Sequence, residues 1–324
     1  MAFPNISDML TTTIENRSRK IADNVTNNNA ILMSLKKGGK IKPFAGGHKI
    51  YQELSFAENS NAGWYTGYDI LPTGISDVIS AAEFNIKQAA VPVVISGLEQ
   101  LQNSGREQMI DLMEGRMSVA ESTLANLIVG GIYSDGTASG GKQIDGLEAM
   151  VPLDPTASSY GSIDGNVYTF WQNAIKNSAD TTTLQADWNE LWSNLVRGQD
   201  RPNLIMTDST AWRVYLASLQ ANQRFSNTDK ADAGFVTIKF MDADVVLDGG
   251  IYNGAVTAGV PTGVAFFLNT KYLHYRPHSA RNMVPLSPNR RYATNQDAEV
   301  QIIGWAGNMT CSGRMFQGRW DGNA

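Results

Sequence analysis

The sequence predicts an α+β protein, and three patterns in it support this expectation. The first is a run of apolar residues at helical spacing between residues 105 and 130. The second is a pair of strand-like segments, residues 50–56 and 82–95, separated by residues 57–78, which show no regular periodicity. The third is an alternation of helical and strand patterns across residues 184–268. Together these patterns indicate sheets covered by helices around a substantial core.

The composition fits either a chain that makes extensive contact with other protein or an ordinary soluble protein of low charge. Its 324 residues suffice for one large domain or two ordinary ones, and 42% of them are hydrophobic. Only 18% are charged, against about 25% in an average soluble domain. Interface cores are depleted in charge, although a low-charge soluble protein has the same composition. The net charge of −5 argues against a dedicated nucleic-acid binder, whose binding surface is basic.

Residues 1–44 are predicted to form an N-terminal arm. Their helical periodicity is weak, and they contain little that could build a core without neighbours. Charge is uneven here, because residues 1–50 carry eight lysines and arginines against three acidic residues. Such a basic arm fits a nucleic acid, an acidic partner or a solvated surface. The candidate basic residues are Arg17, Arg19, Lys20, Lys36 and Lys37.

Residues 45–95 are predicted to form a long hairpin with a wide tip. The connection, residues 57–78, is unusually long for a loop without secondary structure, and such loops tend to be functional. It contains Trp64, Tyr65 and Tyr68. Aromatic side chains are typical anchors of protein interfaces, so we expect these three to contact another subunit. The alternative is that the ribbon folds back on its own domain.

The longest helix is expected over residues 105–130. Ser104 and Glu107 have the spacing of a capping box, and Gly130 with Gly131 are predicted to end the helix. A glycine-rich loop, residues 134–146, follows. The apolar face of this helix is predicted to consist of Met109, Met113, Met117, Ala120, Leu124, Leu127 and Ile128.

The middle of the chain predicts a layer of helices and strands. Helices are expected at residues 184–197 and 209–223, the second capped by Asp208, with strands at 203–207, 236–240, 244–247 and 264–268. The face of the first helix is predicted to contain Leu184, Trp188, Leu191, Trp192 and Leu195. Two long strands, 298–305 and 308–316, are expected near the end of the chain.

The glycine-rich loop contains an incomplete phosphate-binding motif. Gly136 to Lys142 fits G-x-x-x-x-G-K, but Gln143 stands where the motif needs the serine or threonine that binds magnesium. The segment also follows a helix, whereas a working loop follows a strand. A nucleotide-dependent enzyme that uses Lys142 is therefore a minor alternative.

No other set of residues predicts catalysis, a metal or a cofactor. Asp242, Asp244 and Asp248 lack the spacing of a calcium loop. His274 and His278 lie four apart but on a strand-like segment, where that spacing does not form a metal site. Cys311 is the only cysteine, so no disulfide within the chain is possible. The sequence also shows no signal peptide and no membrane span.

The order of the predicted parts carries a resemblance to a known family. The residues that carry it are Trp64–Asp69 in the hairpin, Ile95–Glu99 before the long helix, Ser134–Thr137 and Asp145–Leu147 after it, and Gly304–Gly307 near the end. In this order the chain resembles the major capsid protein of tailed bacteriophages, which has the Hong Kong 97-type fold. The likeness covers nearly the whole chain.

The resemblance implies a division of the chain. Residues 1–44 would be the N-arm, 45–95 the E-loop, 96–183 the peripheral domain with its spine helix, and 184–290 the axial domain. Residues 291–324 would return to the peripheral domain as strands. Some relatives crosslink a loop lysine to a neighbour. Because residues 57–78 contain no lysine, non-covalent closure is expected here.

The resemblance also implies a function and partners. The chain would be a structural protein without catalysis, assembling into pentamers and hexamers of an icosahedral shell around double-stranded DNA. It would reside in the virion after assembly in the cytoplasm of a host bacterium. The 44-residue arm leaves no room for the long scaffolding region of some relatives, so a separate scaffolding protein is implied, together with a portal and, as a further candidate, a decoration protein. The basic residues of the arm would face the interior or the scaffold. An encapsulin-like cellular shell is the alternative with the same fold.

Overall fold

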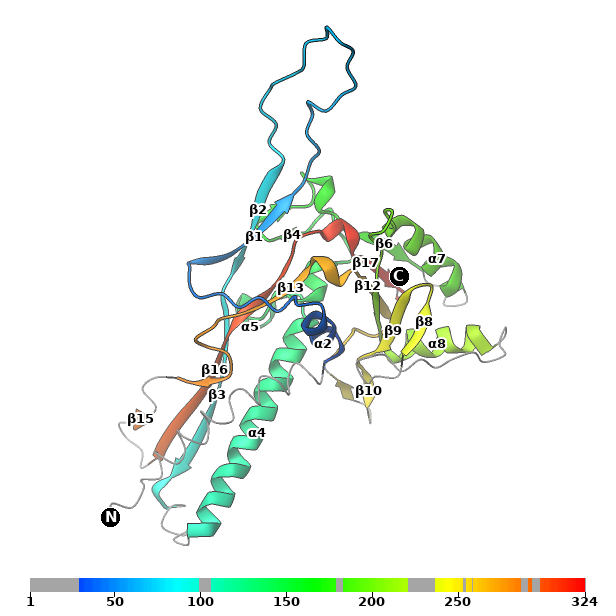
Figure 1. Ribbon diagram of the computed structural model, residues 1–324. Helices are drawn as coiled ribbons and strands as arrows, with labels where there is room; N and C mark the ends of the chain where they lie inside the picture. The colour runs from blue at the N-terminus through cyan, green and yellow to red at the C-terminus, as the bar shows by residue number, and fades with distance from the viewer. Residues whose placement is uncertain are drawn as a thin grey trace.

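The protein is elongated, with a hairpin that projects from one end and a long helix that reaches the other (Figure 1). The computed structural model describes residues 29–98, 106–178, 183–220, 237–252, 255–257, 259–286, 291–292 and 298–323. No helix within these ranges is long and apolar enough to cross a membrane.

The projecting hairpin is built from β1 (Lys49–Ser55) and β2 (Ile79–Asn85), which pair antiparallel along their whole lengths. The prediction of one strand over residues 82–95 is wrong, because the chain changes partner at Ile86. The next strand, β3 (Lys87–Ser96), pairs antiparallel with β16 (Ala298–Cys311) near the end of the chain. Pairing between segments so distant in sequence cannot be read from the local apolar pattern.

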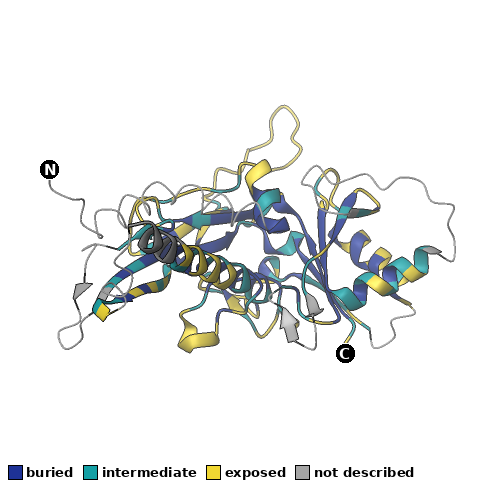
Figure 2. Cartoon of the chain, turned by 90° about the horizontal axis from the view of Figure 1, so that it is seen from below, coloured by how far each residue is buried: buried dark blue, intermediate teal, exposed yellow. Residues whose placement is uncertain are grey.

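The predicted long helix is confirmed as α4 (Arg106–Ile132), which lies alongside β3 and β16 (Figure 1). Its 27 residues span about 40 Å. The side chains that it buries against the sheet are Met117, Ala120, Leu124, Ile128 and Ile132. The opposite face is exposed along much of the helix, as Figure 2 shows.

Two details of that helix differ from the prediction. Leu127 is 52% exposed instead of buried. Gly130 and Gly131 do not end the helix but lie inside it, and a Cβ on Gly131 would stand 3.1 Å from the side chain of Ile144. Gly131 therefore allows close packing against Ile144 and does not mark a turn. Ser104 of the predicted capping box and the side chains of Glu107, Met109 and Met113 lie outside the described residues.

A six-stranded sheet with two helices forms the compact part of the molecule. Its strand order is β6-β17-β12-β7-β9-β8, and α7 and α8 lie beside it (Figure 1). Trp188 of α7 is fully buried and stacks on Tyr215 of α8 with ring centroids 4.9 Å apart. The elements are α7 (Leu184–Leu195), α8 (Ser209–Gln220), β6 (Ala174–Asn177), β7 (Leu204–Thr207), β8 (Thr237–Phe240), β9 (Ala243–Leu247), β12 (Val264–Leu268) and β17 (Gly318–Asp321).

The predictions for this region are largely confirmed. All five residues predicted for the apolar face of α7 are buried. Asp208 caps α8, because its carboxylate oxygens accept hydrogen bonds from the amides of Thr210 and Ala211 at 2.9 and 2.8 Å. Two strands of the sheet, β6 and β17, come from outside residues 184–290.

The second large sheet runs beside α4, with β16 at its centre. β16 pairs with β3, β13 (Leu273–Pro277), β14 (Val284–Pro285) and β15 (Arg291–Tyr292). The prediction of two final strands is wrong, because β16 continues unbroken through Gly304 and Gly307. A Cβ on Gly307 would stand 2.7 Å from the carbonyl oxygen of Arg276. These glycines therefore permit close packing and do not interrupt the strand.

The described end of the predicted arm is packed on the body of the protein. α2 (Ala30–Lys37) buries Ile31, Leu32 and Leu35, so the neighbours that this segment is expected to need are supplied by the same chain for residues 29–44. After α2 the chain runs parallel to β13, where the Lys42 amide donates to the Tyr275 carbonyl at 2.9 Å. The smaller elements are α5 (Ala138–Gly141), α6 (Leu147–Met150), β4 (Ser159–Tyr160), β5 (Ile163–Asp164), β10 (Gly250–Tyr252) and β11 (Ala255–Thr257).

Candidate functional site

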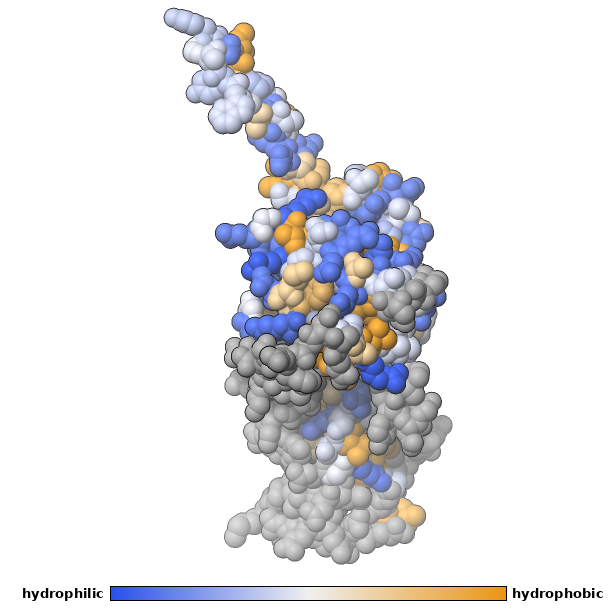
Figure 3. Space-filling view, turned by 90° about the vertical axis from the view of Figure 1, so that its right-hand side faces the viewer, coloured by the Kyte–Doolittle hydropathy of each residue, from blue (hydrophilic) through white to orange (hydrophobic). Residues whose placement is uncertain are grey.

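The loop at the tip of the hairpin, residues 57–78, stands clear of the rest of the molecule (Figure 3). Trp64 and Tyr68 are 106% and 104% exposed, and Tyr65 is 66% exposed. The alternative that this ribbon folds back on its own domain is therefore wrong. Three further apolar residues that the sequence patterns did not single out are also exposed on the loop, namely Ile70, Leu71 and Ile75.

The loop holds its shape through short-range hydrogen bonds. The amide and hydroxyl of Thr66 both donate to Asp69 Oδ2, at 2.8 and 3.0 Å, which closes a turn beside the aromatic residues. These two bonds, the one from the backbone first, lower the pKa of Asp69. Asn61 Nδ2 donates to the Gly74 carbonyl at 2.5 Å and so joins the two sides of the loop. The polar side chains thus shape the loop and leave its apolar side chains exposed.

The base of the hairpin is fixed by an aromatic cluster. Phe84 of β2 meets Tyr160 edge-on with ring centroids 5.0 Å apart, and Phe56 stacks on Phe170 at 5.3 Å. The Glu83 amide donates to the carbonyl of Gly161, where an added Cβ would stand 2.8 Å from Phe84. The loop therefore projects from a rigid base.

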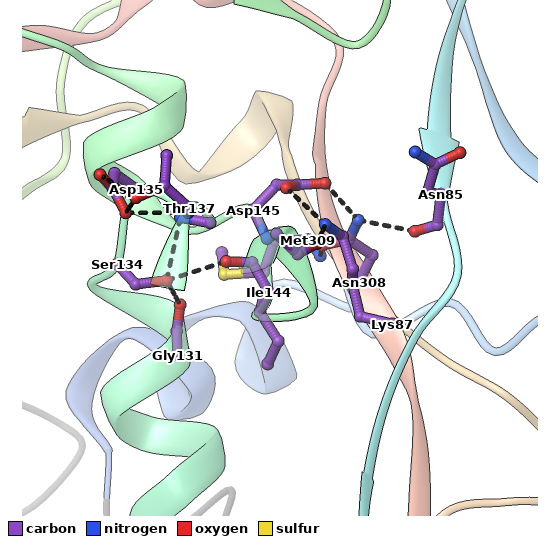
Figure 4. Close-up of polar contacts among 12 residues, drawn as sticks. Asn85, Lys87, Gly131, Ser134, Asp135, Thr137, Ile144, Asp145, Asn308 and Met309 are labelled. Carbon is purple, nitrogen blue, oxygen red and sulfur yellow. Dashed lines mark hydrogen bonds and ion pairs between the residues drawn. The ribbon is translucent and has the colours of Figure 1, made fainter. Parts of the chain in front are cut away.

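The glycine-rich loop after α4 is pinned in place by polar contacts, which Figure 4 shows. Ser134 Oγ lies 2.9 Å from the carbonyl oxygens of Gly131 and Ile144, and its single hydroxyl proton is shared between these two acceptors. Gly136 has a φ of 78°, a left-handed conformation that glycine adopts without strain, and a Cβ there would stand 2.6 Å from Asp145 Oδ1. Hydrogen bonds and close packing at Gly136 therefore hold this loop in place.

Asn308 of β16 joins the glycine-rich loop to the hairpin. Its side chain is fully buried, and its Nδ2 donates to Asp145 Oδ2 at 2.7 Å and to the Asn85 carbonyl at 2.9 Å (Figure 4). Its Oδ1 accepts from the Asp145 amide at 3.0 Å. Lys87 Nζ lies 3.2 Å from Asp145 Oδ1 and donates to the Gly141 carbonyl at 2.7 Å. One buried amide thus links three segments of the chain.

The geometry of this loop does not fit a phosphate-binding loop. The segment follows helix α4 and contains only the single turn α5, whereas the motif connects a strand to a helix N-terminus. Ser139 and Gly140 have left-handed φ values of 56° and 69° inside α5, which breaks it as a helix. Lys142 is exposed on the surface. The nucleotide-binding alternative has no structural support in this segment.

The other candidate ligands do not come together. The structure shows no group of three His, Cys, Asp or Glu side chains that could hold a metal within the residues it describes. His274 is buried, whereas the Nδ1 of His278 accepts from the Ala280 amide at 3.0 Å. Asp242 pairs with Arg201 at 2.6 Å, whereas Asp248 accepts hydrogen bonds from Tyr133 and Asn29. Burial raises the pKa of Cys311 to about 12, so this thiol is unreactive.

A partly buried polar cluster that the sequence patterns did not indicate joins three regions of the fold. Asp248, after β9, accepts hydrogen bonds from the hydroxyl of Tyr133 at the end of α4 and from Asn29 Nδ2. The Oδ1 of Asn29 also caps α2 by accepting from the Leu32 amide at 3.1 Å. Burial raises the pKa of both Asp248 and Tyr133. These residues lie far apart in sequence, so no local pattern could have revealed them.

An apolar groove of about 460 Å³ lies between β3 and the exposed side of α4. Arg116 of α4 crosses it, because its Nη1 donates to the Val94 carbonyl of β3 at 2.7 Å. The other residues that line the groove are Val91, Pro92, Val93, Gly115, Val119, Ala120 and Thr123.

The predicted basic candidates fall in two places. Lys36 and Lys37 lie in the last turn of α2 and are exposed. Arg17, Arg19 and Lys20 lie outside the described residues.

Comparison with known proteins identifies the fold. No protein-family model matches the sequence, and no curated protein matches it. Among solved structures, the chain is similar to one described as the capsid asymmetric unit of cyanophage A-1(L), with a TM-score of 0.62 and 14% identity over 88% of this chain and 91% of that chain. It is also similar to the capsid of a native GTA particle, with a TM-score of 0.56 and 10% identity over 90% of each chain.

A third solved structure has the same fold. The capsid of Myoviridae phage XM1 matches with a TM-score of 0.50 and 12% identity over 89% of this chain and 91% of that chain. Identities this low establish the fold alone, and the coverage shows that the likeness extends over nearly the whole chain. The chain therefore has the α+β fold of tailed-phage major capsid proteins, the predicted Hong Kong 97-type fold.

Proposed function

We propose that this chain is a major capsid protein whose copies assemble into pentamers and hexamers of a closed icosahedral shell around double-stranded DNA. The observation that carries the proposal is the projecting loop, residues 57–78, with Trp64 and Tyr68 fully exposed on a fold found in phage capsids. Its role is structural and not catalytic. The virion is its location, after assembly in the cytoplasm of a bacterium.

The exposed aromatic residues of the loop support an assembly role. A Trp and a Tyr side chain together can bury on the order of 300–500 Å² on contact with a partner. In the single chain they bury none of their surface, since Trp64 and Tyr68 are fully exposed. Large apolar side chains gathered on a projection mark an interaction site. We infer that Trp64, Tyr65 and Tyr68 are contacts between subunits.

The groove between β3 and α4 is the surface that fits this loop in a second copy. The groove is apolar and is crossed by Arg116. The loop offers apolar side chains together with Glu58, Asp69 and Asp77, and residues 57–78 contain no lysine, arginine or histidine. In this pairing, apolar side chains of the loop would meet the apolar groove, and acidic residues of the loop would lie near Arg116. Because the loop has no lysine, the contact would close without a covalent crosslink from this loop.

The proposal includes a division of the chain and further partners. The arm (residues 1–44), E-loop (45–95), peripheral domain (96–183 and 291–324) and axial domain (184–290) are the proposed parts. The basic residues Arg17, Arg19, Lys20, Lys36 and Lys37 would face the interior or a scaffold. The proposed partners are a separate scaffolding protein, a portal and a decoration protein.

Electron microscopy of the expressed chain, alone and with its scaffolding protein, tests the proposal. We expect closed shells from the wild type, and a folded protein without shells from the double variant Trp64→Ser/Tyr68→Ser. The control Leu153→Ser/Val167→Ser removes two exposed apolar side chains elsewhere and should leave shells intact.

Two outcomes would count against this function. Only small soluble particles from the wild type under every condition would contradict shell formation. Normal shells from the Trp64→Ser/Tyr68→Ser variant would remove the role of the loop. Shells that enclose an enzyme and no DNA would point instead to a cellular nanocompartment.

A further inference from the structure

Two neighbouring segments of the fold carry cations and no carboxylate. Residues 29–52 and residues 269–286 contain no aspartate or glutamate, although the chain as a whole has a net charge of −5. Their cations are Lys36, Lys37, Lys40, Lys42, Lys49, Lys271, Arg276 and Arg281. A segregation of charge of this kind favours an anionic partner.

The backbone brings the two segments together side by side. Residues 40–44 run parallel to β13, with bridges from Ile41 to Tyr275 and from Phe44 to His278. The Tyr275 amide donates to the Lys40 carbonyl at 3.1 Å, and the Phe44 amide donates to the Pro277 carbonyl at 3.1 Å. The strap after α2, residues 40–44, therefore acts as an added parallel strand.

The alternation of side chains along a strand places the basic groups on one face. Ile41 and Tyr275 are bridge partners and both pack into the hydrophobic core. Successive side chains of a strand point to opposite faces. The residues before and after each of these two partners therefore lie on the face of the strand pair that points away from the core. We call this face the strap face, and it consists of Lys40, Lys42, His274 and Arg276.

The described part of the structure provides no compensating charge for the groups of the strap face. Within the described part of the chain, Lys40, Lys42 and Arg276 form no ion pair, and the buried Nε of Arg276 has no hydrogen-bond partner. His274 is 4% exposed, and its Nδ1 has no partner among the described residues. Burial first, and then the charges of Lys42, Lys40 and Arg276, lower the pKa of His274 to about 4. His274 is therefore neutral at physiological pH, and the face still carries three formal charges.

Like charges on adjacent strands repel, so an arrangement of this kind is stabilised by an external anion. We propose that the strap face binds the phosphate backbone of nucleic acid without sequence preference. Lys40 and Lys42 stand about 6.6 Å apart along an extended chain. They form, with Arg276 on the neighbouring strand, a row that suits a linear polyanion better than a single ion. Contacts of lysine and arginine with phosphate carry no sequence information.

The other possible occupant is an acidic protein segment, such as the loop of a second copy. That loop carries Glu58, Asp69 and Asp77. One of these carboxylates is already engaged, because Asp69 Oδ2 accepts two hydrogen bonds from Thr66. Nucleic acid presents a regular line of phosphates, at about one charge per 1.7 Å of duplex, and matches the row more fully.

DNA binding by the full-length protein tests the inference directly. Fluorescence anisotropy with a short mixed-sequence duplex is measured across a series of salt concentrations for the wild type and for Lys40→Gln/Lys42→Gln. The variant should bind at least about tenfold more weakly, with a salt dependence shallower by about 0.9 for each phosphate that it no longer neutralises. The control Arg213→Gln/Lys239→Gln removes two exposed cations from elsewhere and should bind like the wild type.

Folding is checked separately, by circular dichroism and the midpoint of thermal unfolding. Lys40 and Lys42 join the strap to β13 through main-chain atoms, so glutamine should leave the fold unchanged. A second variant, Arg276→Lys, retains the charge and should retain most of the binding, whereas Arg276→Gln should weaken it.

Three results would overturn the inference. The first is no DNA binding by the wild type, and the second is equal DNA binding by the wild type and Lys40→Gln/Lys42→Gln. The third is that Lys40→Gln/Lys42→Gln still binds DNA but no longer binds a peptide of residues 57–78. The last result would assign the face to an acidic protein segment. The inference rests on the proposed function in one respect, because a shell around double-stranded DNA would supply the DNA that the strap face binds. Shells without DNA binding would contradict the inference alone, whereas DNA binding without shells would contradict the proposed function alone.

Discussion

Two glycine-rich loops of this protein have opposite relations to the rest of the fold. In the projecting loop, residues 57–78, a Cβ added at Gly63 or Gly67 would meet no atom within 4 Å. In the pinned loop, residues 134–146, a Cβ at Gly146 would stand 2.4 Å from the Ile132 carbonyl oxygen. Glycine thus permits an open chain in one loop and close packing in the other. Glycine content alone does not distinguish the two.

The polar side chains of the two loops differ in the same way. Among the described residues, the hydrogen bonds of the Asn61 and Asp69 side chains stay within the projecting loop. Asp145 of the pinned loop bonds to Asn308 and lies beside Lys87, both in other segments. The pinned loop therefore helps hold the single chain together, whereas the projecting loop leaves its surface for a partner. Substitutions should separate these two roles.

The largest effect on stability is expected from Gly146→Ala. The new methyl group would stand 2.4 and 2.5 Å from the carbonyl oxygens of Ile132 and Gly131, which belong to the end of α4. Overpacking against backbone should lower the free energy of unfolding by about 3 kcal/mol. Chemical denaturation measures this, with Gly63→Ala as the matched change in open space. Equal stability of the two variants would show that the loops do not differ in packing.

Asn308→Ala should have the next largest effect. It removes the amide that bonds to Asp145 and to the Asn85 carbonyl, and it leaves the Asp145 carboxylate without that donor. Unsatisfied buried polar groups should lower the free energy of unfolding by about 2 kcal/mol. The control Asn61→Ala removes an exposed amide from the projecting loop and should stay within about 0.5 kcal/mol of the wild type. A large loss of stability in that control would mean that the projecting loop also stabilises the single chain.

The pH dependence of stability should distinguish Asp248 from Asp69. Burial raises the pKa of Asp248 above its ordinary value of 3.8, so the folded protein retains a proton that the unfolded chain releases. This contribution to stability is fully present below the unfolded pKa and is lost as the pH rises through the folded pKa. In the wild type, the free energy of unfolding should therefore decline with rising pH by at most about 1.4 kcal/mol per pH unit through this group, and Asp248→Asn should remove that decline.

For Asp69 the sign is reversed. The hydrogen bonds from Thr66 lower the pKa of this carboxyl, so its contribution to stability is present above the unfolded pKa and is lost as the pH falls. Unfolding of Asp248→Asn, Asp69→Asn and the wild type at a series of pH values checks both signs. If the free energy of unfolding of Asp248→Asn still declines with rising pH, another group causes the decline.

The smallest effect on stability is expected from Trp64→Ser/Tyr68→Ser. Both side chains are fully exposed in the single chain, so the free energy of unfolding should change by less than about 0.5 kcal/mol. Thermal or chemical unfolding of the unassembled protein measures this change. A substantial destabilisation would show that the projecting loop packs on its own chain in solution, which is incompatible with its proposed role between subunits.

Elements with a local cause could be predicted from the order of the residues. The long helix, the buried face of α7 and the Asp208 cap follow from apolar spacing and from one side chain beside a helix start. The exposure of Trp64, Tyr65 and Tyr68 could also be predicted, because residues 57–78 show no periodicity that would bury them. The order of these parts was enough to indicate the capsid fold.

The complete fold sets the contacts between segments distant in sequence. It pairs residues 87–96 with β16 instead of continuing the hairpin, and it extends β16 through Gly304 and Gly307. It also places Asn29, Tyr133 and Asp248 in one cluster. It also placed Lys40 and Lys42 beside β13. The physical reason is that strand pairing, close approach at glycine and burial of polar groups depend on which surfaces meet. Local periodicity and capping carry no information about that choice.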